Sequence, residues 1–281
     1  MAMASSLLKT SVYNTKSVSH AMLNNIYVPV AGALAQERAL ETIANNLANV
    51  NTVGFKADSV AFTLLEPEPH KNYPSAIPPA NYKEDMKDVY PLRGNEMASV
   101  GIAEMERDFS QGPAMNTHNK YDVMLEGEGF LAVQTSEGAR YTRAGNLSLS
   151  NDGILISKNG DPILGEKGLI SVRSTDFEIN QQGEIFQDGQ LVDKLKLVTF
   201  DNPKELEKVG NNNYFFGGDE TTIKSADGLR VQQGFLEGSN VNAIKSMTSM
   251  IVAHRSYEAY QKAVANYDKM MEKSSNTIGQ V

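Results

Sequence analysis

The longest run of regular hydrophobic spacing lies near the C-terminal end of the chain. Residues 239–278 contain neither glycine nor proline. Apolar side chains recur there every seven residues, with a second set three positions later: Met250, Ala253, Tyr257, Tyr260, Val264, Tyr267, Met271 and Ile278. This heptad predicts one long helix with an apolar seam, roughly 50 Å in length at 1.5 Å per residue. Ser239, Asn240 and Asn242 are its candidate N-caps.

A second helix is predicted near the N-terminus, over residues 26–51. This stretch is rich in alanine, leucine, glutamine and glutamate, which favour helix, and Pro29 and Gly32 place its firm start near residue 30. Gly54 is expected to end it. Its apolar stripe consists of Ala33, Leu40, Ile43, Leu47 and Val50.

The chain between the helices divides into two zones. In residues 56–120, six of the ten prolines fall within 67–91, so that part should be extended rather than helical. Residues 121–236 contain short apolar runs separated by pairs of turn residues, which predict antiparallel strands joined by hairpins. The expected turns are Asp152-Gly153, Asn159-Gly160, Asp188-Gly189 and Gly217-Gly218.

Together these zones predict an α+β protein, in which long N- and C-terminal helices form a coiled-coil-like stalk and carry an inserted antiparallel β-domain. An apolar seam must be covered in water, so we expect the helices to pair antiparallel and to leave part of the longer seam for another subunit. The expected parts are a disordered extension over 1–21, an N-terminal helix region over 22–55, an extended proline-rich segment over 56–120, the β-domain over 121–236 and a C-terminal helix region over 237–281.

Composition narrows the classes of function. The net charge is −8, from 34 acidic and 26 basic side chains, which disfavours binding to nucleic acid or to an anionic membrane surface. No stretch approaches the ~18 apolar residues of a membrane-spanning helix, so we expect no membrane insertion. The absence of cysteine excludes disulfides, thiolate catalysis and thiolate metal sites.

No motif for catalysis or for a cofactor emerges. The four histidines are far apart in sequence, and the glycine-spaced loop at 160–165 is followed by an acid where a phosphate loop needs lysine. The pairs Glu66/Glu68 and Glu126/Glu128 have the residue type of a glycosidase dyad, but their settings favour solvated carboxylates. We therefore expect no enzyme activity and no cofactor. A β-domain enzyme or a carbohydrate-binding module on a coiled-coil stalk is the alternative.

Asparagine is concentrated at the end of the first predicted helix. Asn45, Asn46 and Asn49 fall within five residues, although asparagine is a mediocre helix former. Its side chain both donates and accepts hydrogen bonds, so a helix face lined with it can hold an adjacent subunit in a fixed register. This concentration indicates an assembly contact in preference to a plain helix end.

The asparagines belong to a pattern that resembles a known family. Segment 45–56, with Asn-Asn-Leu-Ala-Asn followed by Thr-x-Gly-Phe-Lys, is similar to the N-terminal signature of bacterial flagellar rod and hook proteins. Segments 236–241 (Leu-Glu-Gly-Ser-Asn-Val) and 253–258 (Ala-x-Arg-x-Tyr-Glu) resemble the C-terminal signature. Segments 125–130 (Leu-Glu-Gly-Glu-Gly-Phe) and 141–146 (Tyr-Thr-Arg-Ala-Gly-Asn) resemble the β-domain of that family.

The resemblance covers residues 22–279 and implies a structural subunit of the basal-body rod, the axial driveshaft that transmits torque. Its terminal helices would assemble with copies of itself and with other rod subunits, after passage through the flagellar type III export apparatus, in the rod that spans the periplasm. Residues 165–172 and the pair Glu237-Gly238 are more similar to the proximal rod, and the distal rod is the alternative. The proline-rich stretch 67–91 has no counterpart in the resemblance.

The expected assembly interface takes its members from the signatures and from the apolar seams. Burying each apolar seam residue is worth ~1.5–3 kcal/mol, which offsets the cost of ordering the chain only when neighbouring subunits contribute. The expected members are Leu40, Ile43, Asn45, Asn46, Leu47, Asn49, Thr52, Gly54, Phe55, Ser239, Asn240, Val241, Met250, Arg255, Tyr257, Tyr260, Val264, Tyr267 and Met271.

Overall fold

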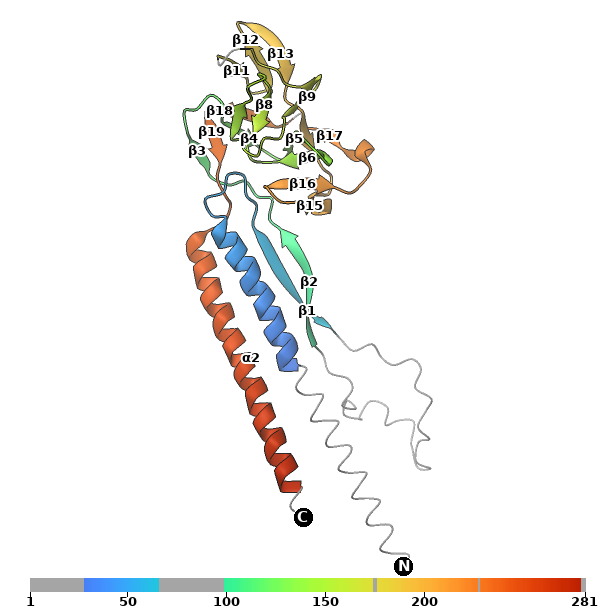
Figure 1. Ribbon diagram of the computed structural model, residues 1–281, viewed down its shortest axis with the longest axis vertical. Helices are drawn as coiled ribbons and strands as arrows, with labels where there is room; N and C mark the ends of the chain where they lie inside the picture. The colour runs from blue at the N-terminus through green and yellow to red at the C-terminus, as the bar shows by residue number, and fades with distance from the viewer. Residues whose placement is uncertain (1–27, 66–98, 174–175, 227, 279–281) are drawn as a thin grey trace, which may run out of the picture. The chain divides into compact units, whose positions relative to one another are not determined.

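The computed structural model describes residues 28–65, 99–173, 176–226 and 228–278. These residues form two α-helices and many antiparallel strands, so the predicted α+β class is confirmed (Figure 1). The expected disordered extension over 1–21 and the proline-rich stretch 67–91 lie outside the described residues.

The chain divides into two compact units, each built from segments that are far apart in sequence. The described part of the first unit comprises 28–42, 60–65, 99–105 and 248–278. The second unit comprises 43–59 and 106–247, and it contains most of the strands.

Each of the two α-helices lies within a stretch that the sequence predicted as helical. The N-terminal helix spans residues 28–48, and α2 spans Ala243–Ile278. The 36 residues of α2 extend over about 54 Å. Asn242 is the N-cap, since its Oδ1 accepts a hydrogen bond of 3.0 Å from the backbone N–H of Lys245.

In the first unit, the N-terminal helix and α2 run side by side in opposite directions (Figure 1). A Cβ atom at Gly32 would lie 2.5 Å from Cε1 of Tyr260, so glycine allows the helices to approach closely at this point. The buried positions of the N-terminal helix within this unit include Gly32, Ala35, Ala39 and Thr42. Their spacing of three and four residues shows that small side chains form the inner face of this helix.

The largest sheet has six antiparallel strands in the order β15-β16-β6-β5-β14-β17. The central strand β5 is buried on both faces, because Phe130 and Ala132 join one apolar cluster while Leu131 and Val133 join another. A continuous apolar run is typical of a strand that is covered on both sides. The strands are β5 Phe130–Thr135, β6 Gly138–Thr142, β14 Leu197–Thr199, β15 Leu206–Lys208, β16 Asn213–Phe216 and β17 Lys224–Ser225.

Smaller sheets and two short 3-10 helices complete the described fold. β1 Asp58–Leu65 pairs with β2 Ser99–Arg107, β3 Ala114–Asn116 with β19 Phe235–Glu237, β4 Val123–Glu126 with β18 Arg230–Gln233, β7 Leu147–Leu149 with β8 Leu155–Ser157, and β9 Leu164–Gly165 with β10 Gly168–Leu169. β11 Glu178–Ile179, β12 Glu184–Gln187 and β13 Gln190–Lys194 form a three-stranded sheet. The 3-10 helices are η2 Pro203–Glu205 and η3 Glu220–Thr222.

Three of the four predicted turns are present. Asp188-Gly189 joins β12 to β13 with positive φ at both residues, as a two-residue hairpin requires. Gly153 and Gly160 also have positive φ, and each donates its backbone N–H to the carbonyl three residues earlier. The hairpin predicted at Gly217-Gly218 is wrong, because β16 pairs with the preceding β15 and with β6 rather than with a following strand.

Candidate functional site: the signature junction

Four of the five signature segments meet in the second unit, at a place that we call the signature junction (residues 54–58, 108–112, 125–127, 143–145 and 237–240). The backbone N–H of Gly54 donates to the carbonyl of Glu237 at 2.8 Å. The backbone N–H of Asn240 donates to the carbonyl of Phe55 at 3.4 Å. The segments that follow the first helix and precede α2 are thus joined directly through their backbones.

A buried cluster of three charged side chains lies at the centre of the junction. Glu237 Oε1 accepts hydrogen bonds from Lys56 Nζ at 2.6 Å and from the backbone N–H of Gly112 at 2.9 Å. Its other oxygen accepts from an Arg143 guanidinium N–H at 3.3 Å. The side chains of Lys56, Glu237 and Arg143 are 1%, 1% and 4% exposed. One carboxylate therefore compensates two cations that water does not reach.

Backbone carbonyls accept further hydrogen bonds from the two cations, although Arg143 Nε is buried without an acceptor. Lys56 Nζ donates to the carbonyl of Ser110 at 2.7 Å, and Arg143 donates to those of Leu125 and Gly127 at 3.4 and 2.6 Å. Burial lowers the pKa of Lys56, and the charge of Glu237 opposes that effect. Burial likewise lowers the pKa of Arg143, again opposed by Glu237. Both cations therefore rely on this single carboxylate for charge compensation in a dry site.

Gly54 is in close contact with the chain around Arg143. Its φ is +66°, and a Cβ atom would lie 2.5 Å from the carbonyl carbon and oxygen of Arg143. The prediction that Gly54 ends the first helix is wrong, since that helix already ends at residue 48. The polypeptide then turns, with the Thr52 hydroxyl donating to Asn49 Oδ1 at 3.1 Å. Glycine is needed at position 54 for a backbone contact between distant segments.

Two asparagine side chains fix the strand that leaves the N-terminal signature. Asn46 is buried; its Nδ2 donates to the carbonyl of Asp58 at 2.6 Å, and its Oδ1 accepts from the N–H of Asp58 at 3.0 Å. Asn240 Oδ1 accepts from the N–H of Ala57 at 2.8 Å, while its Nδ2 donates to the carbonyl of Asp108 at 2.8 Å. Each side-chain amide therefore both accepts from a backbone N–H and donates to a backbone carbonyl, as a peptide group of a neighbouring strand would.

We expect Asn46→Asp to lower the free energy of unfolding by about 1–3 kcal/mol, because a carboxylate oxygen would replace the donor that faces the carbonyl of Asp58. Urea unfolding followed by circular dichroism measures the change. Asn45→Asp is the matched control, since it adds the same charge at an exposed neighbour. Equal losses in the two variants would contradict a specific role for the Asn46 amide.

An aromatic and ionic layer borders the junction. Phe55 is 2% exposed, and the Lys208 ammonium lies 3.9 Å from its ring centroid, an arrangement typical of a cation–π contact. Lys208 also pairs with Asp58 at 3.5 Å, and Arg107 pairs with the same carboxylate at 2.7 Å. Burial lowers the pKa of Lys208, an effect that Asp58 opposes. The N-terminal signature is thereby fastened to β15 and β2.

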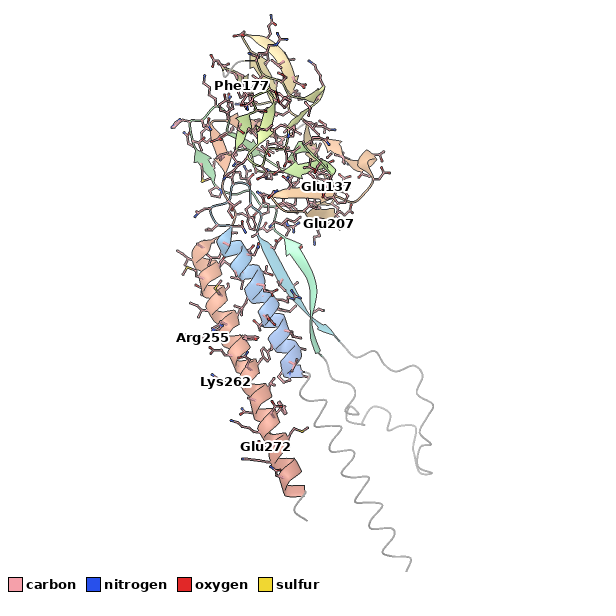
Figure 2. All side chains as sticks on the ribbon, in the orientation of Figure 1. Glu137, Phe177, Glu207, Arg255, Lys262 and Glu272 are labelled. Carbon is pink, nitrogen blue, oxygen red and sulfur yellow. The ribbon has the colours of Figure 1, made fainter. Side chains whose placement is uncertain are left out.

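The structure brings only some of the expected interface residues to the junction. Gly54, Phe55, Ser239 and Asn240 lie in it, and Asn46 is bound to its edge at Asp58. Elsewhere, Ala253 on the α2 seam is buried and Arg255 projects outward (Figure 2). The half-buried members are Leu40, Ile43, Leu47, Asn49, Thr52, Val241, Met250, Tyr257, Tyr260, Val264, Tyr267 and Met271. Their contacts with other subunits stay predictions.

The sequence prediction missed the charged residues of the junction. Lys56, Arg143 and Glu237 belong to the quoted signature segments, but they were not among the expected site residues. A signal was present, because each stands beside small or apolar residues in a segment that resembles the family. The local sequence does not indicate how these charges pair, because Lys56 and Glu237 are 181 residues apart in the chain.

The structure shows no arrangement suited to catalysis in the part of the chain it describes. Glu126 and Glu128 are both exposed, and Glu126 accepts a hydrogen bond from Gln232 at 3.0 Å. Glu66 and Glu68 lie outside the described residues. Within the described ranges, no three His, Asp or Glu side chains converge as metal ligands, and neither helix has an apolar stretch long enough to cross a membrane.

Three family models match the segments that form the junction and the helices. They are "Flagella basal body rod protein" over residues 26–56, "Flagellar hook protein FlgE/F/G D1 domain" over 124–187 and "Flagellar basal body rod FlgEFG protein C-terminal" over 232–277. The signature segments of the junction thus lie mainly within matched regions.

Whole-length relatives agree with these matches. The chain is 29% identical to the flagellar basal-body rod protein FlgF of Caulobacter vibrioides, over 92% of this chain and 100% of that protein. It is 31% identical to the rod protein FlgG of Borreliella burgdorferi, over 91% of this chain and 98% of that protein. The hook-basal body complex protein FlhO of Bacillus subtilis is 28% identical over 92% of this chain. The chain therefore belongs to the flagellar basal-body rod protein family.

Proposed function

We propose that this protein is a structural subunit of the flagellar basal-body rod. The observation that carries the proposal is its similarity to rod proteins along more than nine-tenths of its length. The family consists of structural proteins rather than enzymes. The subunit is accordingly placed in the rod, where its neighbours are other rod and hook subunits.

The position along the rod is a narrower proposal, and we place this subunit in the proximal part. Segment 165–172 and the pair Glu237-Gly238 support this position. Relatives named FlgF and FlgG have similar identities, 29% and 31%, so the distal rod is the alternative. In either position the subunit would transmit torque through its packed helices.

Assembly is proposed to occur through the terminal helices, as a coiled-coil-like stalk. Support comes from the close approach of Gly32 to Tyr260 and from the heptad seam of α2, in which Ala253 is buried and the members from Met250 to Met271 are otherwise half-buried. The first turns of α2 also carry apolar side chains that are more than half exposed: Ile244, Met247, Ile251 and Val252. Such surface is normally covered by another chain.

Passage through the type III export apparatus is proposed to precede folding. A chain without cysteine cannot be trapped by disulfides while it is unfolded. The ion pair between Lys56 and Glu237 joins positions 181 residues apart, so it forms only when both ends of the chain are available. The junction would therefore be completed last.

We expect Tyr260→Asp to reduce incorporation into basal bodies strongly, because a carboxylate would replace an aromatic ring of the seam at the point where Gly32 meets it. Immunoblots of purified basal bodies and swimming assays measure the effect. Gln261→Asp, at an adjacent exposed position, is the matched control. Normal incorporation of Tyr260→Asp, or normal swimming after deletion of residues 243–278, would contradict assembly through the helices.

A further inference from the structure

A hollow of about 550 Å³ lies in the second unit beside the N-terminal signature. Its wall comes from three segments, 45–55, 144–159 and 208–212. Seven of its fourteen lining residues are asparagine, and we call it the asparagine hollow. Its volume is in the range of pockets that hold a ligand or several residues of a peptide.

One buried amide oxygen at the rim of the hollow lacks an internal partner. Asn212 Nδ2 donates to the carbonyl of Val53 at 2.7 Å, but its buried Oδ1 accepts no hydrogen bond in the described structure. A buried acceptor without a donor costs about 1–3 kcal/mol, so this rim of the hollow is held at an energetic cost. Asn211 and Asn212 both have positive φ, which holds this rim of the hollow in an uncommon conformation.

The hollow is also a basic region on an acidic protein. Lys158 and Lys208 line it, and its described lining includes no carboxylate. Lys208 is already paired with Asp58, whereas Lys158 is exposed and has no carboxylate partner among the described residues. The chain as a whole has a net charge of −8, so copies of it and subunits like it offer many carboxylates to this site.

We propose that the asparagine hollow is the docking site for an extended acidic peptide segment of a neighbouring rod subunit. The side-chain amides of Asn45, Asn146 and Asn211 make no hydrogen bond within the described structure. Each presents a donor and an acceptor with the geometry of a peptide group, so it can pair with the backbone of an extended chain. Lys158 would receive an acidic side chain of that segment. This inference rests on the proposed function, because it requires that rod subunits are neighbours.

A saccharide is the competing occupant and fits the site less well. Sugar rings are commonly held by stacking on an open aromatic face. The one aromatic ring among the described lining residues is that of Phe55, which is 2% exposed and is covered by the ammonium of Lys208. The amides and the lysine remain for hydrogen bonding, which suits a peptide backbone.

The test places a photo-crosslinking amino acid at position 51 of the full-length protein in motile cells, followed by isolation of basal bodies and mass spectrometry. Asn51 lines the hollow and is exposed, so this substitution leaves Lys158 in place. A crosslink to an acidic peptide of a rod subunit supports the inference. A crosslink to a saccharide, or no crosslink in basal bodies that contain the protein, overturns it and leaves the proposed function intact. Absence of the protein from basal bodies, with the wild-type chain as well, would overturn both.

A charge-reversal variant of Lys158 provides a quantitative test of the same inference. We expect Lys158→Glu to lower recovery in basal bodies about tenfold, the effect of ~1.4 kcal/mol of like-charge repulsion. Lys196→Glu makes the same change at an exposed lysine outside the hollow, and its recovery should equal that of the wild type. Resistance of both purified variants to protease checks folding. Equal recovery of the two variants would overturn the role of Lys158.

Discussion

Replacing Glu237 with alanine is expected to lower the free energy of unfolding of the second unit by about 3–5 kcal/mol, because two buried cations would lose their shared carboxylate. The backbone N–H of Gly112 would lose its acceptor as well. Urea unfolding measures the change, with circular dichroism and the fluorescence of the 11 tyrosines as signals, since the chain has no tryptophan.

Glu207→Ala is the matched control for this prediction. Glu207 lies on β15 and is exposed, so the variant removes the same charge from the surface (Figure 2). Its effect should be within about 0.5 kcal/mol of zero, as for most surface substitutions. A comparable loss in both variants would show that the carboxylate of Glu237 contributes only through net charge.

The pH dependence of the Glu237→Ala variant provides a second readout. Burial lowers the pKa of Lys56 below its ordinary value of 10.5, and the variant removes the carboxylate that opposes this shift. Between the folded and unfolded pKa values the unfolded chain binds more protons, so stability rises with pH in that window. The deficit of the variant relative to wild type should therefore shrink as the pH approaches 10.5. A deficit that grows with pH would contradict this account.

The second large effect is expected for Gly54→Ala, with a loss of about 2–5 kcal/mol. A left-handed conformation costs an alanine about 1–2 kcal/mol, and forcing its Cβ against the carbonyl of Arg143 adds about 1–3 kcal/mol. The displaced segment carries Arg143, so the buried ion cluster should be disturbed as well. Urea unfolding measures the stability, and protease resistance reports on the second unit.

Gly160→Ala separates the two contributions to the Gly54 effect. Gly160 has a φ of +89°, but a Cβ atom there would meet nothing within 4 Å. This control therefore measures the conformational cost without the steric one, and its loss should be about 1–2 kcal/mol. Equal losses in the two variants would mean that the structure accommodates a Cβ atom at position 54 without a steric cost.

Local patterns were sufficient for most of the secondary structure. The heptad from Met250 to Met271 predicted α2, because the seven-residue spacing of apolar side chains matches the helical repeat and can be seen in one continuous segment. Asp188-Gly189 predicted a hairpin for the same reason, since two residues suffice to set a turn. The hairpin predicted at Gly217-Gly218 was wrong because a Gly-Gly pair can also follow the end of a strand. Here it follows β16, which pairs with β15 and β6 and not with the next strand.

The first helix shows the limit of a hydrophobic pattern. The sequence favoured Leu40, Ile43 and Leu47 as its inner stripe, but they are half-buried, whereas Gly32, Ala35 and Ala39 are buried. Small residues carry little hydrophobicity and are overlooked in a search for apolar periodicity. Their importance appears only where another helix approaches closely, as Tyr260 does at Gly32.

The sequence by itself determined the α+β class, the long C-terminal helix, most of the tight turns and, through its signature segments, the family. Each of these depends on residues that are near one another in the chain or on a short motif. The tertiary structure alone decided that Lys56, Arg143 and Glu237 form a buried cluster, that Gly54 serves a backbone contact and that asparagines surround a hollow. The physical reason is that burial and electrostatic pairing depend on which distant segments meet, and a pattern along the chain does not carry that information.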